Sequence, residues 1–190
     1  MPRMKQAMRT LTSQASVEWY TPPEIIDLAR RVLGGIDLDP ASCPEANRWI
    51  GATQFYTKAD DGLSLPWHGR VWLNPPYGTG RDGKIGNRSS QGVWAEKAIA
   101  EFRSGRVAAA LILTKAVPGY DWWDRLFQAI PVCITRGRLS FIPGEGYPTG
   151  DGRSKAASSI WYLGYKHDRF IDVFKEIGRV ILPDLGHWLE

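Results

Sequence analysis

The stretch Arg70-Val71-Trp72-Leu73-Asn74-Pro75-Pro76-Tyr77-Gly78 decides the fold prediction. Residues 70–73 are typical of a buried strand, and the two prolines end it because proline has no backbone N–H to donate to a neighbouring strand. The strand therefore delivers Asn74 and Tyr77 into a loop at its carboxyl end. In open α/β sheets, binding sites lie at the carboxyl ends of the strands.

The segments on both sides of this stretch alternate between strand and helix patterns. The most apolar run, residues 107–113, is typical of a central parallel strand, and a helix is expected over 93–103. Another helix is expected to start after Thr21 and end at Leu33, and further helices are expected over 44–49, 121–129 and 169–177. The other predicted strands are 36–39, 54–56, 132–135, 139–142, 159–163 and 180–182. The pattern predicts an α/β fold with a mostly parallel sheet, an antiparallel C-terminal strand and helices on both faces.

The first of these helices has recognisable start and stop signals. Thr21 is placed as the N-cap, Pro22 at the first helical position and Glu24 three residues after the cap, which together form a capping box. Gly34 follows the last apolar residue of the pattern and is expected to end the helix.

Length and composition favour one soluble catalytic domain. The chain has 190 residues, of which 43% are hydrophobic and 23% charged, enough for one hydrophobic core but not two. We expect a basic, mobile arm over residues 1–15 and a single domain over 16–190. No apolar run is long enough to span a membrane and no secretory signal opens the chain, so we expect a cytoplasmic protein without a membrane partner.

The cysteines and histidines argue against a disulfide scaffold and against a metal site. Cys43 and Cys133 lie far apart and form no C-x-x-C pair, and the three histidines are equally scattered. We therefore expect no metal. The net charge of +4 is compatible with a polyanionic partner but only supports other arguments.

The four residues Asn74, Pro75, Pro76 and Tyr77 carry a chemical prediction. An exocyclic amine on a nucleobase is a poor nucleophile because its lone pair is delocalised into the ring. The Asn74 side-chain oxygen and the Pro75 carbonyl can accept hydrogen bonds from such an amine, while Pro76 stiffens the turn and Tyr77 offers a ring for stacking. The competing interpretation is an ordinary strand-ending turn, since Asn-Pro is common in turns.

The same order of motifs runs through most of the chain and resembles a known family. Asn74-Pro75-Pro76-Tyr77 matches the [DNS]-P-P-[YFW] motif of the S-adenosylmethionine-dependent amino-methyltransferases, and the chain is similar to the small, Dam-like, phage-type DNA N6-adenine methyltransferases among them. The other matching segments are Trp19 to Pro23, Asp37 to Ser42 with Asn47, Asp60 to Leu63 with Trp67, Trp94 with Lys97 and Ala98, and Gly137 to Leu139 with Phe141.

The resemblance implies a Rossmann-like class I methyltransferase fold with S-adenosyl-L-methionine as cofactor. An acidic residue at a strand end binds the cofactor ribose in this fold, and either Asp37 or Asp39 fits that place. The other implied cofactor-binding residues are Tyr20, Thr21 and Pro22 at the methionine end, Pro40 in the turn after the strand, and Asp60 or Asp61 at the cofactor adenine.

One departure from the family pattern concerns the cofactor site. Related enzymes carry a Gly-rich F-x-G-x-G loop, and no such triplet lies between Tyr20 and Asn74. Either residues 37–42 merge two motifs of the larger enzymes, or the Gly-rich segment has been lost.

The resemblance implies direct transfer of a methyl group to the N6 of a flipped-out adenine in DNA, held by Asn74 to Tyr77, without a metal or a covalent intermediate. It also implies a phage origin, a role connected with restriction-modification and the cytoplasm of a bacterial host cell. We expect a monomer or weak dimer. Phosphate contacts are expected from the basic side chains Arg81, Lys84, Arg88 and Arg138.

Two other functions remain open. The same tetrapeptide occurs in enzymes that methylate RNA or protein glutamine, so a related acceptor is the closest enzymatic alternative. A catalytically silent DNA-binding module of the same fold is the second, because the Gly-rich cofactor loop is missing.

Overall fold

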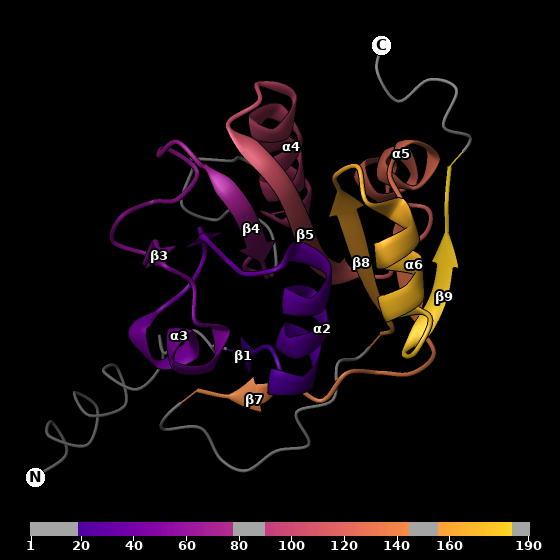
Figure 1. Cartoon of the computed structure of the whole chain (residues 1–190), viewed down its shortest axis with the longest axis horizontal. Helices are drawn as coiled ribbons and strands as arrows, with labels where there is room; N and C mark the ends of the chain where they lie inside the picture. The colour runs from indigo at the N-terminus through magenta and orange to yellow at the C-terminus, as the bar shows by residue number, and fades with distance from the viewer. Residues whose placement is uncertain (1–18, 78–89, 145–155, 184–190) are drawn as a thin grey trace, which may run out of the picture.

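The structure is a computed structural model that describes residues 19–77, 90–144 and 156–183 (Figure 1). A seven-stranded sheet in the order β3-β2-β4-β5-β8-β6-β9 forms its centre, and a two-stranded sheet joins β1 to β7. The strands of the large sheet are β2 (Leu38–Asp39), β3 (Gln54–Phe55), β4 (Gly69–Leu73), β5 (Val107–Lys115), β6 (Val132–Thr135), β8 (Ser158–Leu163) and β9 (Gly178–Ile181). The small sheet pairs β1 (Trp19–Tyr20) antiparallel with β7 (Ile142–Pro143).

The large sheet confirms the predicted mixed α/β class, with most strands running in one direction. Strands β3, β2, β4 and β5 are parallel neighbours. Strand β8 is antiparallel to both β5 and β6, so β6 runs with the first four, and β9 is antiparallel to β6. The sequence predicted one antiparallel C-terminal strand. The structure has two in this sheet, with β8 inside it and β9 at its edge.

Helices cover both faces of the sheet, as predicted. They are α2 (Pro23–Leu33), α3 (Pro44–Ile50), α4 (Ser90–Arg103), α5 (Asp121–Ala129) and α6 (His167–Phe174). In Figure 1, α2 and α6 lie in front of the sheet and α4 and α5 behind it.

Alternating side chains of the strands build a separate core on each face, because successive residues of a strand point to opposite sides. Trp72 and Leu111 belong to the core that α2, α3 and α6 cover. Val71 and Ile112 belong to the core that α4 and α5 cover. All four side chains are fully buried, so the middle of the sheet is a rigid support for the loops at its edge.

The predicted N-cap of the first helix is wrong by one residue. Helix α2 begins at Pro23, with Pro22 as its N-cap and no side-chain cap. Thr21 is 1% exposed, and its hydroxyl has no hydrogen-bond partner among the described residues. Pro23 rather than Pro22 takes the first helical position, so the threonine lies outside the helix. The stop at Gly34 is confirmed, since its φ of 81° is left-handed and its N–H donates to the Arg30 carbonyl.

The predicted strand over 139–142 is also displaced. Only Ile142 and Pro143 form β7, and they pair with β1 rather than with the large sheet. The predicted arm over residues 1–15 lies outside the described residues. Within the described ranges, no helix is long and apolar enough to cross a membrane.

Candidate active site

The Asn74 amide lies just past the carboxyl end of β4, between β2 and β5 in the sheet order. Its Nδ2 donates to the Trp19 carbonyl at 3.4 Å, which connects β1 to the loop after β4. The Tyr77 hydroxyl donates to Asn74 Oδ1 at 3.4 Å. The amide nitrogen is therefore directed to the protein backbone, and the amide oxygen keeps capacity to accept a second hydrogen bond.

The Tyr77 ring is held by two neighbours from other elements. Phe141 meets it edge to face, with ring centroids 6.4 Å apart. The Lys115 Nζ lies 4.9 Å from the ring centroid, within the range of a cation–π contact. Burial raises the pKa of the Tyr77 hydroxyl, so the hydroxyl remains a hydrogen-bond donor toward Asn74 at neutral pH.

Thr21 carries a buried polar group directly after β1. Its carbonyl accepts a hydrogen bond from Trp49 Nε1 in α3 at 2.9 Å, and the Tyr20 ring contacts the Trp49 ring at 5.7 Å. The Thr21 hydroxyl, in contrast, finds no partner among the described residues. A buried hydroxyl without a partner costs free energy, so this position fits a polar ligand.

Asp39 is the acidic residue at the carboxyl end of β2, and it is 2% exposed. The Ala41 N–H donates to its Oδ1 at 3.1 Å. Burial raises the pKa of Asp39 to about 7, although the hydrogen bond from the Ala41 amide opposes the rise. A carboxyl group with few charged partners near the end of a parallel strand is a candidate for ribose hydroxyls.

Asp37 lies before β2, at the opposite end of the strand from Asp39. Its carboxylate accepts hydrogen bonds from Arg70 Nε and Nη2 at 2.8 and 2.7 Å and from the Arg70 backbone N–H at 2.7 Å. The side-chain hydrogen bond from Arg70 lowers the pKa of Asp37 to about 2. The sequence left open whether Asp37 or Asp39 binds the ribose. Only Asp39 lies at the carboxyl ends of the parallel strands, the side on which Asn74 follows β4. Asp37 lies at the other end and connects β2 to β4 through Arg70.

The turn that carries Asp60 and Asp61 packs against the loop after β2. A Cβ atom on Gly62 would come within 2.0 Å of the Pro40 carbonyl oxygen, so only glycine permits this contact. Asp60 is exposed and accepts hydrogen bonds from the Thr57 N–H and hydroxyl at 2.7 and 2.6 Å, which lower its pKa. Asp61 is half-buried with a left-handed φ of 56°.

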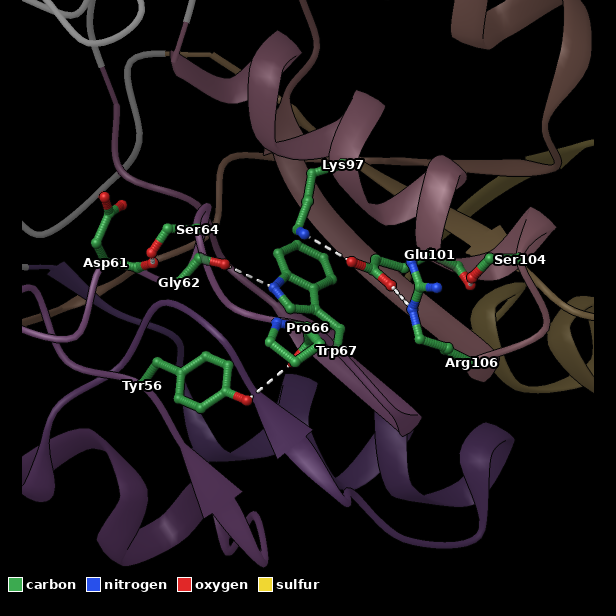
Figure 2. Close-up of polar contacts among 10 residues, drawn as sticks. All are labelled: Tyr56, Asp61, Gly62, Ser64, Pro66, Trp67, Lys97, Glu101, Ser104 and Arg106. Carbon is green, nitrogen blue, oxygen red and sulfur yellow. Dashed lines mark hydrogen bonds and ion pairs between the residues drawn. The ribbon is translucent and has the colours of Figure 1, made fainter.

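A buried tryptophan lies beside this turn and supports it (Figure 2). The Trp67 indole N–H donates to the Gly62 carbonyl at 2.7 Å. The Lys97 ammonium lies 5.9 Å from the Trp67 ring centroid and forms an ion pair with the buried Glu101 at 2.6 Å. Arg106 binds the other Glu101 oxygen. Trp67 and Lys97, both part of the family resemblance, thus connect the Asp60–Gly62 turn to α4.

The other residues that the sequence predicted for the site differ in their exposure. Pro22 and Pro40 are buried, Pro75 is buried and Pro76 is exposed. Arg138 is exposed after β6, and the other predicted DNA contacts, Arg81, Lys84 and Arg88, lie outside the described residues. The described ranges contain no group of three or more histidine, cysteine or acidic residues that could hold a metal ion.

Sequence reasoning missed Lys115. It is the last residue of β5, directly after the most apolar run of the chain. A cation at the carboxyl end of a central strand, next to the strand that carries Asn74, was the signal that could have identified it.

A comparison with protein families identifies one family over most of the chain. The family model described as DNA N-6-adenine-methyltransferase (Dam) matches residues 9–177. A search of curated proteins gives no significant match. The matched range includes β2, β4 and β5, the strands whose carboxyl ends lie at the site described above.

Proposed function

Because the chain belongs to the DNA N-6-adenine-methyltransferase (Dam) family, we propose that it transfers a methyl group from S-adenosyl-L-methionine to the N6 of a flipped-out adenine in DNA. One observation carries the proposal. The Asn74 amide is held by Trp19 and Tyr77, so that its oxygen is presented at the carboxyl edge beside Asp39. We propose that the sheet serves as a Rossmann-like class I scaffold for this chemistry.

Asn74 and Pro75 activate the acceptor in this proposal. The Asn74 Oδ1 atom and the Pro75 carbonyl oxygen accept the two hydrogens of the adenine amine, which concentrates the lone pair on N6. As N6 forms its bond to the methyl carbon, the bond between that carbon and the sulfonium sulfur would break, with its electron pair left on sulfur and S-adenosylhomocysteine as the product. The positive charge on the amine grows meanwhile, and both hydrogen bonds become stronger. One amine proton then leaves N6 and is lost to solvent.

Tyr77 holds the adenine after it leaves the duplex. Unstacking and unpairing a base costs a few kcal/mol, and stacking on an aromatic ring offsets part of that cost. The contacts with Phe141 and Lys115 fix the Tyr77 ring before DNA binds. A ring fixed in advance loses little conformational freedom when the base stacks on it.

Thr21 and Asp39 are the proposed centre of the cofactor site. S-adenosyl-L-methionine supplies an electrophilic methyl group when it is bound. The unpartnered hydroxyl of Thr21 and the buried carboxyl of Asp39 fit its polar ends. The other proposed contacts are Tyr20, Pro22 and Pro40, with Asp60 or Asp61 at the adenine of the cofactor. The buried Thr21 hydroxyl argues against a silent DNA-binding module, because such a module would gain nothing from a buried hydroxyl without a partner among the described residues.

We further propose that the protein acts in the cytoplasm of a bacterial host cell, in a phage-encoded or restriction-modification setting. DNA is the proposed acceptor rather than RNA or protein glutamine, because the family match extends far beyond the tetrapeptide at Asn74.

The Asn74→Ala variant tests the proposal. It removes one of the two acceptors for the adenine amine, and we expect methyl transfer to DNA to fall by at least about a hundredfold, the usual cost of deleting one such catalytic hydrogen bond. Cofactor affinity, measured by calorimetry, should stay within about twofold because Asn74 does not contact the cofactor in this account.

Gln128→Ala is the matched control, since it removes an exposed amide from α5 and should change neither quantity. Transfer by Asn74→Ala at the wild-type rate would refute the assigned role. A wild-type protein that binds no S-adenosyl-L-methionine would favour the silent DNA-binding module.

A further inference from the structure

Lys115 places a positive charge beside the segment that carries Asn74 and Tyr77. It ends β5, which pairs in parallel with β4, and Leu73 is in register with Ile112. Continuing this register by three residues brings Lys115 level with Pro76. The ammonium group therefore belongs to the same edge of the sheet as the proposed base-binding turn.

The Lys115 backbone is fixed on both sides. It pairs with Ser158 of β8, and its N–H donates to the Gln91 Oε1 atom at 3.4 Å. Gln91 is 4% exposed at the start of α4, and its Nε2 has no acceptor among the described residues. The buried Gln91 amide thus helps to fix the backbone from which the Lys115 side chain extends toward Tyr77.

The Lys115 ammonium has no anionic partner in the described part of the chain. Lys97 and Lys175 each form an ion pair with a carboxylate at 2.6 Å, whereas the contact of the Lys115 Nζ is with the Tyr77 ring at 4.9 Å. The side chain is half-buried. Holding a charge in a partly desolvated place without a counter-charge is unfavourable, so the position is suited to an anion that arrives with the substrate.

We propose that the Lys115 ammonium binds a backbone phosphate of the DNA strand next to the flipped adenine. The inference rests on the proposed function, because it needs DNA at this edge. The ammonium lies over the Tyr77 ring, so a phosphate that it binds would lie next to the base proposed to stack on that ring. A flipped nucleotide keeps its phosphates on both sides, so a phosphodiester is the anion that reaches this edge together with the base.

The salt dependence of DNA binding tests this contact. Each phosphate neutralised in duplex DNA contributes about 0.9 to the slope of log affinity against log salt concentration. We expect Lys115→Met to reduce the slope by about that amount and to weaken binding roughly five- to tenfold at about 0.1 M salt. The probe is an unmethylated, mixed-sequence duplex with S-adenosylhomocysteine present to prevent turnover.

Two variants serve as controls. Lys166→Met removes an equal charge from an exposed position after β8 and should leave the slope unchanged. Lys115→Arg keeps the charge and should restore most of the slope. Thermal unfolding and cofactor affinity of Lys115→Met should match the wild type.

The outcomes separate this inference from the proposed function. Weaker binding with an unchanged slope would mean that Lys115 only positions the Tyr77 ring, and would overturn the phosphate contact. If Lys115→Met binds DNA with the affinity and salt slope of the wild type, the phosphate contact is overturned as well. The proposed function would still stand in that case if the wild-type protein methylates DNA. A wild type that neither binds nor methylates DNA would overturn both.

Discussion

Asp37 and Asp39 are two residues apart, yet their surroundings move their pKa values in opposite directions. Hydrogen bonds from Arg70 lower the pKa of Asp37 to about 2, and burial raises the pKa of Asp39 to about 7. The sequence could place both acids near a strand end but could not choose between them. The choice depends on Arg70, which is 33 residues away from Asp37 and reaches it only through the pairing of β2 with β4.

Because the pKa of Asp39 is raised, we expect the free energy of unfolding to fall as the pH rises. Because its folded pKa exceeds the ordinary value of 3.8, this group stabilises the fold fully below about pH 4, and the contribution is lost as the pH rises to about 7. The Asp39→Asn variant lacks this titration. We expect the unfolding free energy of the wild type to decrease relative to the variant by about 1.4 kcal/mol per pH unit in that window.

Denaturant unfolding of the ligand-free proteins at several pH values measures this difference. Parallel stability profiles for the wild type and Asp39→Asn between pH 4 and 7 would show that the Asp39 carboxyl titrates normally and is not desolvated as described.

At the scale of elements, the contact between Gly62 and Pro40 joins two loops of the proposed cofactor site. In Figure 2, Gly62 lies beside the Trp67 indole, whose N–H donates to the Gly62 carbonyl. The Asp60–Gly62 turn is thereby held from one side by Trp67 and from the other by the loop after β2. Any shift of this turn moves Pro40 and changes the surroundings of Asp39.

Gly62→Ala should therefore impair both stability and cofactor binding. The added methyl group would overlap the Pro40 carbonyl, and overpacking of this kind costs about 1–3 kcal/mol. We expect a lower melting temperature and a weaker affinity for S-adenosyl-L-methionine. Gly137→Ala is the control, since a Cβ there meets no atom within 4 Å, and it should leave both values unchanged. Equal behaviour of the two variants would contradict the close packing at Gly62.

Local sequence signals predicted the elements that local interactions determine. The bounds of α5 and β6 agree with the prediction, and Gly34 ends α2 because a left-handed residue is needed there. The signals failed where tertiary contacts decide. Thr21 looked like a helix cap but is buried beside α3, and the pairing of β7 with β1 joins segments more than a hundred residues apart.

At the scale of the whole molecule, the sheet order brings the separated motifs to one edge. Asp39 ends β2, Asn74 follows β4 and Lys115 ends β5, and these three strands are parallel neighbours. The small sheet then connects Trp19 to Asn74. The sequence predicted strand ends for Asn74 and for either Asp37 or Asp39, but the contacts of Trp19 and Lys115 with this segment required the three-dimensional arrangement.

Nucleoside analysis of the reaction product tests the central claim most directly. Purified protein is incubated with unmethylated DNA and S-adenosyl-L-methionine carrying a labelled methyl group, with RNA and protein acceptors in parallel, and the DNA is digested and its nucleosides are separated. We expect label in N6-methyladenine, and its loss with Asn74→Ala. Label in cytosine, in RNA or in protein, or no label in any acceptor, would contradict it.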